Sequence, residues 1–523
     1  MRNYLHQRSK SLLAFAVGLT ILSSSFAGEV YAAECYYYGS DLATDDSTTT
    51  WDDETQTATL HADRSIDRAF NYSYNFGSQS HTEGQFVSLA GYNPYTVAGA
   101  TGKEKLTLYG DIMSVMNNTL TVKNLDTLQI TNGTYGLDAS FGNDRGPVYT
   151  TDGGINLNNI KNVDISSTKG AIYSQILGKI DLQGIDNLTL ASDGYNTIYC
   201  GYGSLVDINA KNTTITSTGR AILATAGDAN NIFTWHDGSL ETDYPLPVIN
   251  IKSDTLTIAA ATSGKTAAAV YSDPGATINL GSADKKIKQL TFVKDAGANM
   301  NLYSDSHIYE DQRYTQYDSN NPDAYYGRYS DTIPNDETAK YYKLYQAKIN
   351  VYAENAEFNA NTNAINAYNK ALINVNADTA TINSNYATVV AGAGATVTIE
   401  GKDLTINNNN YLNKAQVVDD AKVAIGSGGL LNPSEYGDTS VNAGDIVVNA
   451  ANKLTINGNI VINANPDAAA GNSISINKDN TTALVNITGD IYTNNGNEVH
   501  PWAMAALQSR IAMLPADRLA APR

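Results

Sequence analysis

The stretch INLNNIKNVDISSTKGAIYS, residues 155–174, holds the pattern that decides the fold. It contains three short segments, INL at 155, VDI at 163 and AIY at 171, and the series recurs as IDL at 180, LTL at 188 and TIY at 197. Further first triplets are INI at 249, INL at 278, INV at 349 and INV at 373, with VDI at 206 and VTI at 397 as variants. The chain therefore repeats about every 24 to 26 residues.

Each triplet is predicted to be a short β-strand. Its outer two residues are expected to face the interior and its middle residue the solvent, because side chains alternate with a period of two in a strand. A unit of three such strands is too small to bury its own apolar face, so neighbouring units must stack. The pattern predicts an all-β fold, a right-handed single-stranded parallel β-helix (a solenoid) with three short strands per coil of about 24–26 residues. An antiparallel sandwich or barrel is the alternative.

Stacking places equivalent residues of successive coils in columns. The interior column of the first triplets is expected to contain Ile155, Ile180, Ile249, Ile349 and Ile373. The neighbouring column on the outside is expected to contain Asn156, Asn250, Asn350 and Asn374. The sequence thus predicts an aliphatic interior and a polar exterior.

Residues 1–32 read as a Sec signal peptide. Arg2, Arg8 and Lys10 precede an apolar run over 11–26, and Val30 and Ala32 suit cleavage after Ala32. The apolar run is shorter than the roughly 18 to 20 residues that span a bilayer, which disfavours the alternative of a membrane anchor. We therefore expect a secreted mature chain.

The charge balance argues against nucleic acid as a partner. The chain has 34 basic and 53 acidic residues and a formal net charge of -19, whereas a phosphate-binding surface needs clustered Lys and Arg. With only two cysteines, Cys35 and Cys200, the fold does not rest on a disulfide framework, although a single bridge between the two stays open.

The regular pattern divides the chain into segments. After the signal peptide come an N-terminal irregular β region and cap (33–150), coils (151–300), a Tyr-rich acidic insertion (301–347), further coils (348–499) and an atypical Ala-rich tail (500–523). Within the first of these, WDDETQTATLHA at 51–62 is expected to form a strand or hairpin. A cap would shield the unpaired backbone groups of the first coil.

The insertion at 301–347 is the preferred candidate for a recognition surface. It holds ten of the 34 tyrosines, and tyrosine offers amphipathic contact area at low entropic cost. The candidate binding residues are Tyr303, Tyr309, Tyr325, Tyr326, Tyr329, Tyr341 and Tyr342. The alternative is a solvated loop whose tyrosines pack against the solenoid wall.

No catalytic or metal-binding residue is predicted. The pairs Asp45-Asp46, Asp52-Asp53 and Asp419-Asp420 lie in polar stretches, where neighbouring side chains point to opposite faces. The six histidines are scattered, and the sequence contains neither G-x-S-x-G nor H-E-x-x-H. No cofactor is expected, and weak Ca²⁺ binding by acidic loops stays open.

The signal peptide, the Asn/Thr/Gly-rich coils and phrases such as NKLTINGNIVIN (452–463) and ALVNITGDIYTNNG (483–496) resemble the passenger domains of autotransporters from Gram-negative bacteria. The likeness covers roughly residues 33–499, and the C-terminal translocator barrel of that family is not recognised in this sequence. The resemblance implies display at the bacterial cell surface through the outer-membrane translocation machinery. It also implies adhesion, aggregation or host contact.

Three classes of function follow from these observations. The preferred one is an adhesin-like passenger that contacts host surface glycans or proteins, or associates with itself, without catalysis. The alternatives are a structural passenger fragment without binding activity and a polysaccharide-degrading β-helix enzyme, since the fold alone leaves catalysis open.

Overall fold

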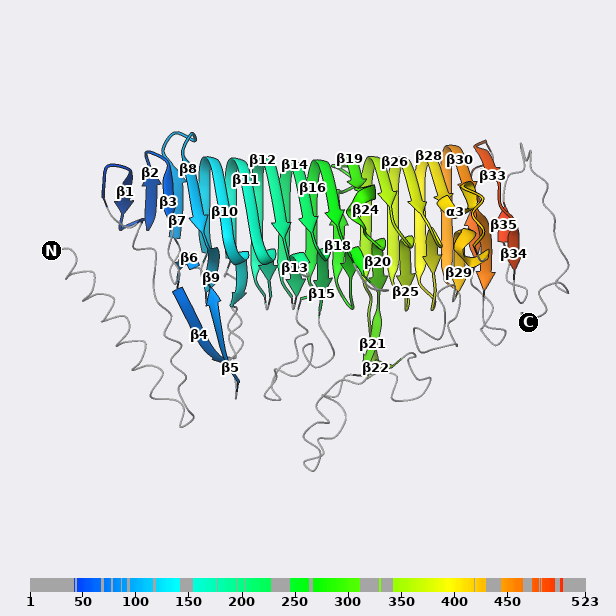
Figure 1. Cartoon of the computed structure of the whole chain (residues 1–523), viewed down its shortest axis with the longest axis horizontal. Coiled ribbons are helices and arrows are strands. Elements are labelled where there is room, and N and C mark those ends of the chain that lie inside the picture. The colour runs from blue at the N-terminus through cyan, green and yellow to red at the C-terminus, as the bar shows by residue number, and fades with distance from the viewer. Residues whose placement is uncertain are drawn as a thin grey trace, which may run out of the picture.

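The structure, a computed structural model, describes residues 42, 45–66, 70–76, 79–85, 87–91, 95–115, 119–141, 154–175, 177–194, 196–201, 203–226, 245–262, 267–310, 329–330, 342–417, 419–428, 444–463, 473–478, 480, 482–493 and 499–501. Nearly all regular structure among them is β-strand, and 30 strands belong to one sheet. The fold is therefore all-β. The strands stand side by side along one long axis (Figure 1).

This sheet consists of three parallel ladders. The first ladder contains β2 (Thr57–Leu60), β7 (Tyr95–Gly99), β10 (Thr119–Phe141), β11 (Gly154–Ser174), β12 (Lys179–Ser192), β14 (Leu205–Ser217), β16 (Val248–Ala260), β18 (Thr277–Leu280), β24 (Lys348–Asn359), β26 (Leu372–Ser384), β28 (Thr396–Asn408), β30 (Asp445–Asn457), β32 (Ile474–Ile476) and β35 (Val499–Pro501). Long strands such as β11 continue from the first ladder into the second.

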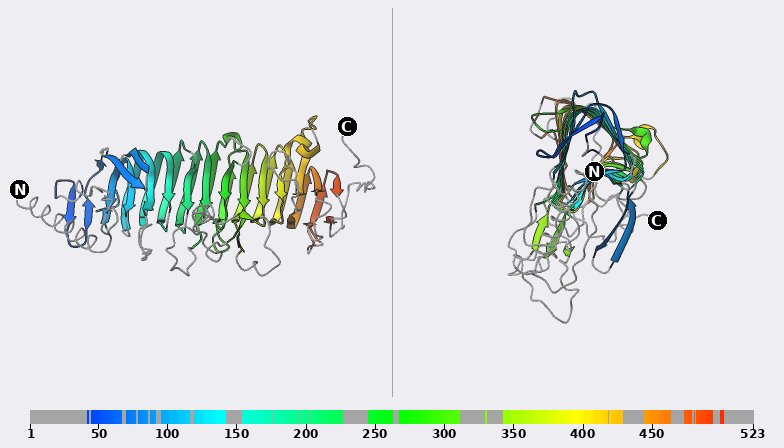
Figure 2. Two further views of the ribbon diagram at one scale, coloured as in Figure 1. Left: turned by 90° about the horizontal axis from the view of Figure 1, so that it is seen from below. Right: turned by 90° about the vertical axis from the view of Figure 1, so that its left-hand side faces the viewer.

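The second ladder begins with β3 (Arg64–Ile66) and β8 (Lys105–Tyr109), continues through the later parts of β10, β11, β12, β14 and β16, and then takes in β19 (Ile287–Phe292), the later parts of β24, β26, β28 and β30, and β33 (Leu484–Ile487). The third ladder contains β6 (Val87–Gly91), β9 (Asp111–Val115), the last parts of β10 and β11, β13 (Asn196–Gly201), β15 (Arg220–Thr225), β17 (Ala268–Ser272), β20 (Met300–Asp305), β25 (Asn363–Tyr368), β27 (Val389–Ala391), β29 (Val423–Gly428), β31 (Asn459–Asn463) and β34 (Ile491–Thr493). Viewed along the long axis, the ladders surround a common interior (Figure 2).

A few elements lie outside the ladders. β1 (Thr49–Asp52) pairs antiparallel with β2, which confirms the hairpin expected at 51–62. β4 (Phe70–Phe76) and β5 (Gln79–Gln85) form a separate hairpin. β21 (His307–Glu310) pairs antiparallel with β22 (Tyr329–Ser330) and β23 (Tyr342–Tyr345), and we call this three-stranded sheet the arm. The short helices are η1 (Lys294–Ala296), α3 (Asn409–Leu412) and η5 (Asp419–Lys422).

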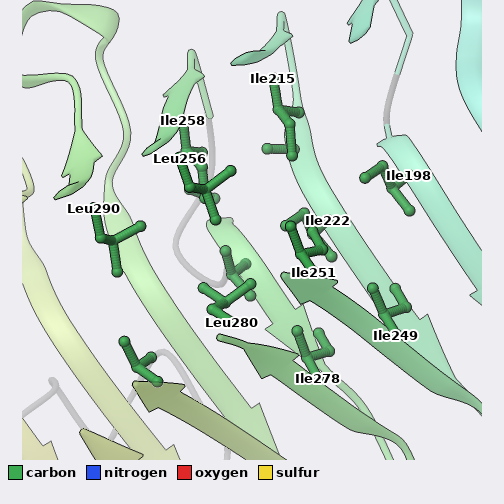
Figure 3. Close-up of a cluster of buried hydrophobic side chains, with 14 of the residues drawn as sticks. Ile198, Ile215, Ile222, Ile249, Ile251, Leu256, Ile258, Ile278, Leu280 and Leu290 are labelled. Atoms are coloured by element: carbon green, nitrogen blue, oxygen red, sulfur yellow. The ribbon is translucent and has the colours of Figure 1, made fainter. Parts of the chain in front are cut away.

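The expected isoleucine column lies in the core. The paired positions of the first ladder are Ile155, Ile180, Val206, Ile249, Ile278, Ile349 and Ile373, and each side chain is fully buried. Burying an aliphatic side chain of this size contributes roughly 1.5 to 3 kcal/mol. Figure 3 shows Ile249 and Ile278 of this column beside Ile215 and Leu256 of the second ladder and Ile222 of the third.

The orientation predicted for the third triplets is wrong, because the middle residue of the triplet faces the interior. In AIY at 171, the middle residue Ile172 belongs to the core, where it pairs with Ile198, which in turn pairs with Ile222. Tyr173 and Tyr199, which were expected to face inward, are instead partly exposed on the outer side. In the first two triplets a polar middle residue marks the outer side. The third triplet lacks such a residue, so alternation gave no signal for its orientation.

Two segment boundaries also differ from the sequence prediction. The ladders already include β2, β3 and β7 to β10, so much of 33–150 is regular sheet. β20 pairs with β17 and β25 in the third ladder, so the first residues of 301–347 belong to the sheet and not to an insertion. The signal peptide and nearly all of the 500–523 tail lie outside the described residues, as does Cys35. Cys200 lies inside the sheet, fully buried.

Asparagine side chains form hydrogen-bonded ladders on the outer side. Asn279 Nδ2 donates to Asn250 Oδ1 at 2.7 Å, Asn350 to Asn279 at 2.8 Å, and Asn374 to Asn350 at 2.9 Å. Asn250, Asn350 and Asn374 are the side chains expected on the exterior, and they are partly exposed. Each amide both donates and accepts, so the series ties neighbouring strands together outside the backbone pairing.

The amide ladder predicts unequal costs for two otherwise identical substitutions. Asn350→Ala removes two ladder hydrogen bonds, whereas Asn374→Ala removes one. A net worth of about 1 kcal/mol for each bond predicts a loss of about 2 kcal/mol for the first variant and about 1 kcal/mol for the second. Urea unfolding followed by circular dichroism measures both losses. Equal losses would contradict the expected dependence of stability on the number of ladder bonds removed.

Candidate functional site

Three long connections of the chain begin at the ends of third-ladder strands. Residues 226–247, 306–347 and 429–444 follow the third-ladder strands β15, β20 and β29. In stacked repeat folds, insertions gathered on one side commonly mark the binding side. The outer side of the third ladder is therefore the first place to look for a site.

Tyrosines recur along that outer side, with one interruption at Leu223, which pairs with both Tyr199 and Tyr271. Tyr173 pairs in register with Tyr199, and Tyr271 pairs with Tyr303. The ring centroids of Tyr173 and Tyr199 are 4.8 Å apart with an interplanar angle of 16°. Tyr135 stacks on Tyr173 at 4.2 Å. We call the outer side of the third ladder from Tyr135 to Tyr303 the tyrosine face.

Stacking of the tyrosine rings determines which of their groups a partner can contact. Because Tyr135 and Tyr199 both stack on Tyr173, both faces of the Tyr173 ring are covered, and each of the other two rings has one face covered by it. Ring edges and hydroxyl groups remain on the outside, which suits hydrogen bonds and edge contacts better than stacking on a sugar ring. Further along, Tyr271 and Tyr303 meet edge to face at 4.9 Å, and Tyr303 is only 6% exposed.

Three tyrosine hydroxyls of this column each donate a hydrogen bond to the side chain two residues further along the chain. Tyr173 donates to Gln175 Oε1 at 2.6 Å, Tyr271 to Asp273 Oδ1 at 3.1 Å, and Tyr303 to Asp305 Oδ2 at 3.1 Å. Burial and nearby carboxylates raise the pKa of the Tyr271 and Tyr303 phenols, so both remain donors at any ordinary pH. These bonds fix the directions of the rings.

Two carboxyl groups lie side by side at the end of the tyrosine face. Ser272 pairs with Ser304, which brings Asp273 and Asp305 to equivalent places on neighbouring strands. Thr225 Oγ1 donates to Asp273 Oδ2 at 3.2 Å, and Asn369 Nδ2 donates to Asp305 Oδ1 at 2.8 Å. Both carboxyl groups are thus held in place by the sheet.

The surroundings of this pair favour the protonated form of Asp273. Burial, together with the charge of Asp305, raises the pKa of Asp273 to about 6, and His307 acts in the opposite direction. His307 Nε2 lies 3.8 Å from Asp305 Oδ2. The Arg220 guanidinium sits 4.7 Å from the centre of the Tyr271 ring, a cation–π contact. The end of the face is therefore a mixed cluster of acids, a histidine and an arginine.

The structure brings few of the predicted binding tyrosines together. Tyr303 lies in the tyrosine face but is buried, which removes it as a contact residue. Tyr309, Tyr329 and Tyr342 belong to strands of the arm. The remaining candidates, Tyr325, Tyr326 and Tyr341, lie outside the described residues.

Sequence reasoning missed Tyr173, Tyr199 and Tyr271 as members of a surface. For Tyr173 and Tyr271 a signal was present in the recurring phrase Tyr-Ser followed by an acceptor, as YSQ at 173 and YSD at 271 and 303, whereas Tyr199 is followed by Cys-Gly. The acceptor of each phrase is the side chain that binds the tyrosine hydroxyl. In the part of the chain that the structure describes, no group of three His, Cys, Asp or Glu side chains is arranged to hold a metal ion.

Comparisons of the chain with protein-family models, with curated proteins and with solved structures gave no match. No helix within the described ranges has the length and hydropathy needed to cross a membrane.

Proposed function

We propose that this chain is a right-handed parallel β-helix of the autotransporter-passenger type, exported and displayed at a bacterial cell surface, and that it acts in adhesion or aggregation. Its partners in this proposal are host surface glycans or proteins, or further copies of the chain. It performs no catalysis. The observation that carries the proposal is the tyrosine face, where Tyr135, Tyr173, Tyr199 and Tyr271 are partly exposed on the ladder from which the long connections leave.

The three ladders support the helical part of the proposal. Strands equivalent in sequence pair in parallel with the next repeat, and parallel pairing requires a return path between neighbouring strands. The other two strands of each repeat supply that path. The signal-peptide pattern of residues 1–32 supports export.

The distribution of side chains supports a contact function. The outer sides of the first and second ladders carry Asn and Thr, such as the exposed Thr189 and Thr214. The third ladder brings the partly exposed Tyr135, Tyr173 and Tyr199 into a stack on its outer side, and Tyr271 with the Arg220 guanidinium lies further along. Aromatic side chains with a polar tip are favoured in recognition surfaces because they provide contact area at low entropic cost. Repetition along a rod would add avidity.

A binding assay on the purified chain tests the proposal. The chain is applied to cultured host cells and to an array of immobilised glycans, and its self-association is followed by light scattering. We expect retention on at least one surface, or concentration-dependent association. We expect Tyr173→Ala with Tyr199→Ala to weaken it at least tenfold.

The matched control is Thr189→Ala with Thr214→Ala. These residues also pair in register on neighbouring layers and are exposed, but they lie on the second ladder. The control should bind like the unchanged chain. A folded, monomeric chain that binds no cell and no glycan would overturn the proposal, and equal losses in both double variants would remove the tyrosine face from it.

A further inference from the structure

We propose that Asp273, Asp305 and His307 form a proton-operated clamp at the base of the arm, closed when the cluster takes up a proton and loosened when the proton leaves. The clamp would regulate the side of the molecule that carries the tyrosine face. Its biological meaning therefore rests on the proposed function, although the clamp itself does not.

The arm is attached to the ladders at two places that both meet this cluster. Its first strand begins at His307, directly after Asp305 and Ser306. Its last strand ends at Tyr345, whose carbonyl accepts a hydrogen bond of 3.1 Å from the Gly275 amide. Ser306 Oγ also accepts a bond of 2.8 Å from the Ala347 amide, which holds the two ends of the arm together.

A tight turn links Asp273 to the arm. Asp273, Pro274, Gly275 and Ala276 form a turn in which the Ala276 amide donates to the Asp273 carbonyl at 3.0 Å. Gly275 has a φ of 75°, as the third position of a type II turn requires. A Cβ on Gly275 would lie 3.4 Å from the Tyr345 ring, so the turn packs directly against the end of the arm.

Charged and titratable groups face Asp273 from every neighbouring strand. Asp305 and His307 act on its carboxyl group, and the Tyr271 hydroxyl bonds to it. Behind them, Arg220 faces the Tyr271 ring, and Tyr303 and Tyr368 pack beside Asp305. The side chains of Asp305 and His307 are only 14% and 28% exposed, so solvent screens their interaction weakly.

The direction of the pH effect follows from the carboxyl group of Asp273. Its pKa is about 6 in the closed cluster and 3.8 in its ordinary state. A raised pKa means that the closed cluster holds its proton more tightly than the open one. The stabilisation is fully present below pH 3.8, declines as pH rises toward 6, and is absent above that. Deprotonation also places two negative charges side by side.

Amide hydrogen exchange of the full chain tests the clamp without any ligand. Exchange of the β21 and β23 amides is measured between pH 4 and 7.5 and divided by the rates of unstructured peptides to give protection factors. We expect protection to fall by roughly 50-fold between pH 4 and 6.5 and to change little above that. Amides of β11 and β12 serve as the internal reference and should show no such fall.

Three variants test whether titration of Asp273 controls the protection of the arm or whether the residues of the cluster only support the fold. Asp273→Asn keeps an acceptor for Tyr271 without a titrating group, so arm protection should be high and independent of pH. His307→Gln removes the group that lowers the pKa of Asp273, so the midpoint should move to higher pH. Asp164→Asn makes the same charge change on an exposed site of the second ladder and should leave the profile unchanged.

Flat protection of the arm in the unchanged chain, or an unaltered profile in Asp273→Asn, would overturn the clamp. Neither result bears on adhesion, because exchange is measured without a partner. Conversely, a chain that binds no cell and no glycan can still show the pH profile.

Discussion

Phe358→Ala is expected to lower the free energy of unfolding by about 3 to 5 kcal/mol. Phe358 of β24 stacks on Phe292 of β19, with ring centroids 5.1 Å apart and an interplanar angle of 20°. Both rings are buried inside the second ladder and are among the largest fully buried side chains of the described residues. Truncation leaves a cavity that the rigid parallel strands on either side cannot close. The loss is measured as the shift of the urea midpoint.

Glu354→Ala is the matched control for this experiment, because it lies on the same strand and is exposed. It should change stability by no more than about 0.5 kcal/mol. A loss below about 1 kcal/mol in Phe358→Ala would mean that the layers around β24 rearrange freely, contrary to the fixed register of β19, β24 and β26.

Gly133→Ala is expected to destabilise the chain by about 2 to 3 kcal/mol through overpacking. A Cβ on Gly133 would lie 1.8 Å from Asp111 Oδ1 and 2.9 Å from the Gly110 carbonyl oxygen. Asp111 is fully buried, so its carboxyl group has no free space to move into. Burial, reinforced by the charge of Asp138, raises the pKa of Asp111 well above its usual range. The stability loss is measured by thermal unfolding at pH 5.

A double-mutant cycle isolates this contact. Asp111→Ala removes the carboxyl group that the new methyl would strike, so the pair Asp111→Ala with Gly133→Ala should be less destabilised than the sum of the single variants. We expect a coupling of about 1 to 3 kcal/mol. Strict additivity would show that the Gly110 backbone, and not the Asp111 side chain, opposes the methyl group.

The sequence was informative wherever a polar residue separated two apolar ones. The triplets INL at 155 and LTL at 188 predict both a strand and which of its side chains face the interior. The structure contains the buried aliphatic columns predicted from them. The third triplets AIY and TIY contain no polar residue that marks the outer side, so their orientation was predicted wrongly. Ile172 pairs with Ile198 and Ile198 with Ile222, and the burial of all three in the core shows that they point inward.

The tyrosine face is hard to recognise in the sequence because its residues come from different strands and are brought together only by the pairing of those strands. Tyr173, Tyr199 and Tyr271 stand alone in their own strands, and nothing local joins them. The prediction instead followed local density and chose 301–347, whose first tyrosine, Tyr303, proves to be buried in the sheet. The residue spacing between layers also varies, which hides equivalence: Leu223 pairs with Tyr271 across a long connection.

The amide ladders give the sheet a direction. In the first ladder Asn374 donates to Asn350 and Asn350 to Asn279, and in the second Asn212 donates to Asn187 and Asn187 to Asn162. Each layer therefore presents an amide oxygen to the layer that follows it in the chain and an amide N–H to the one before. A folded layer thus acts as a template of fixed polarity, and we expect ordered structure to extend from it by addition of one layer at a time. A layer added on the C-terminal side finds free amide oxygens, and a layer added on the N-terminal side finds free amide N–H groups. The two ends of a partly folded chain are therefore chemically distinct.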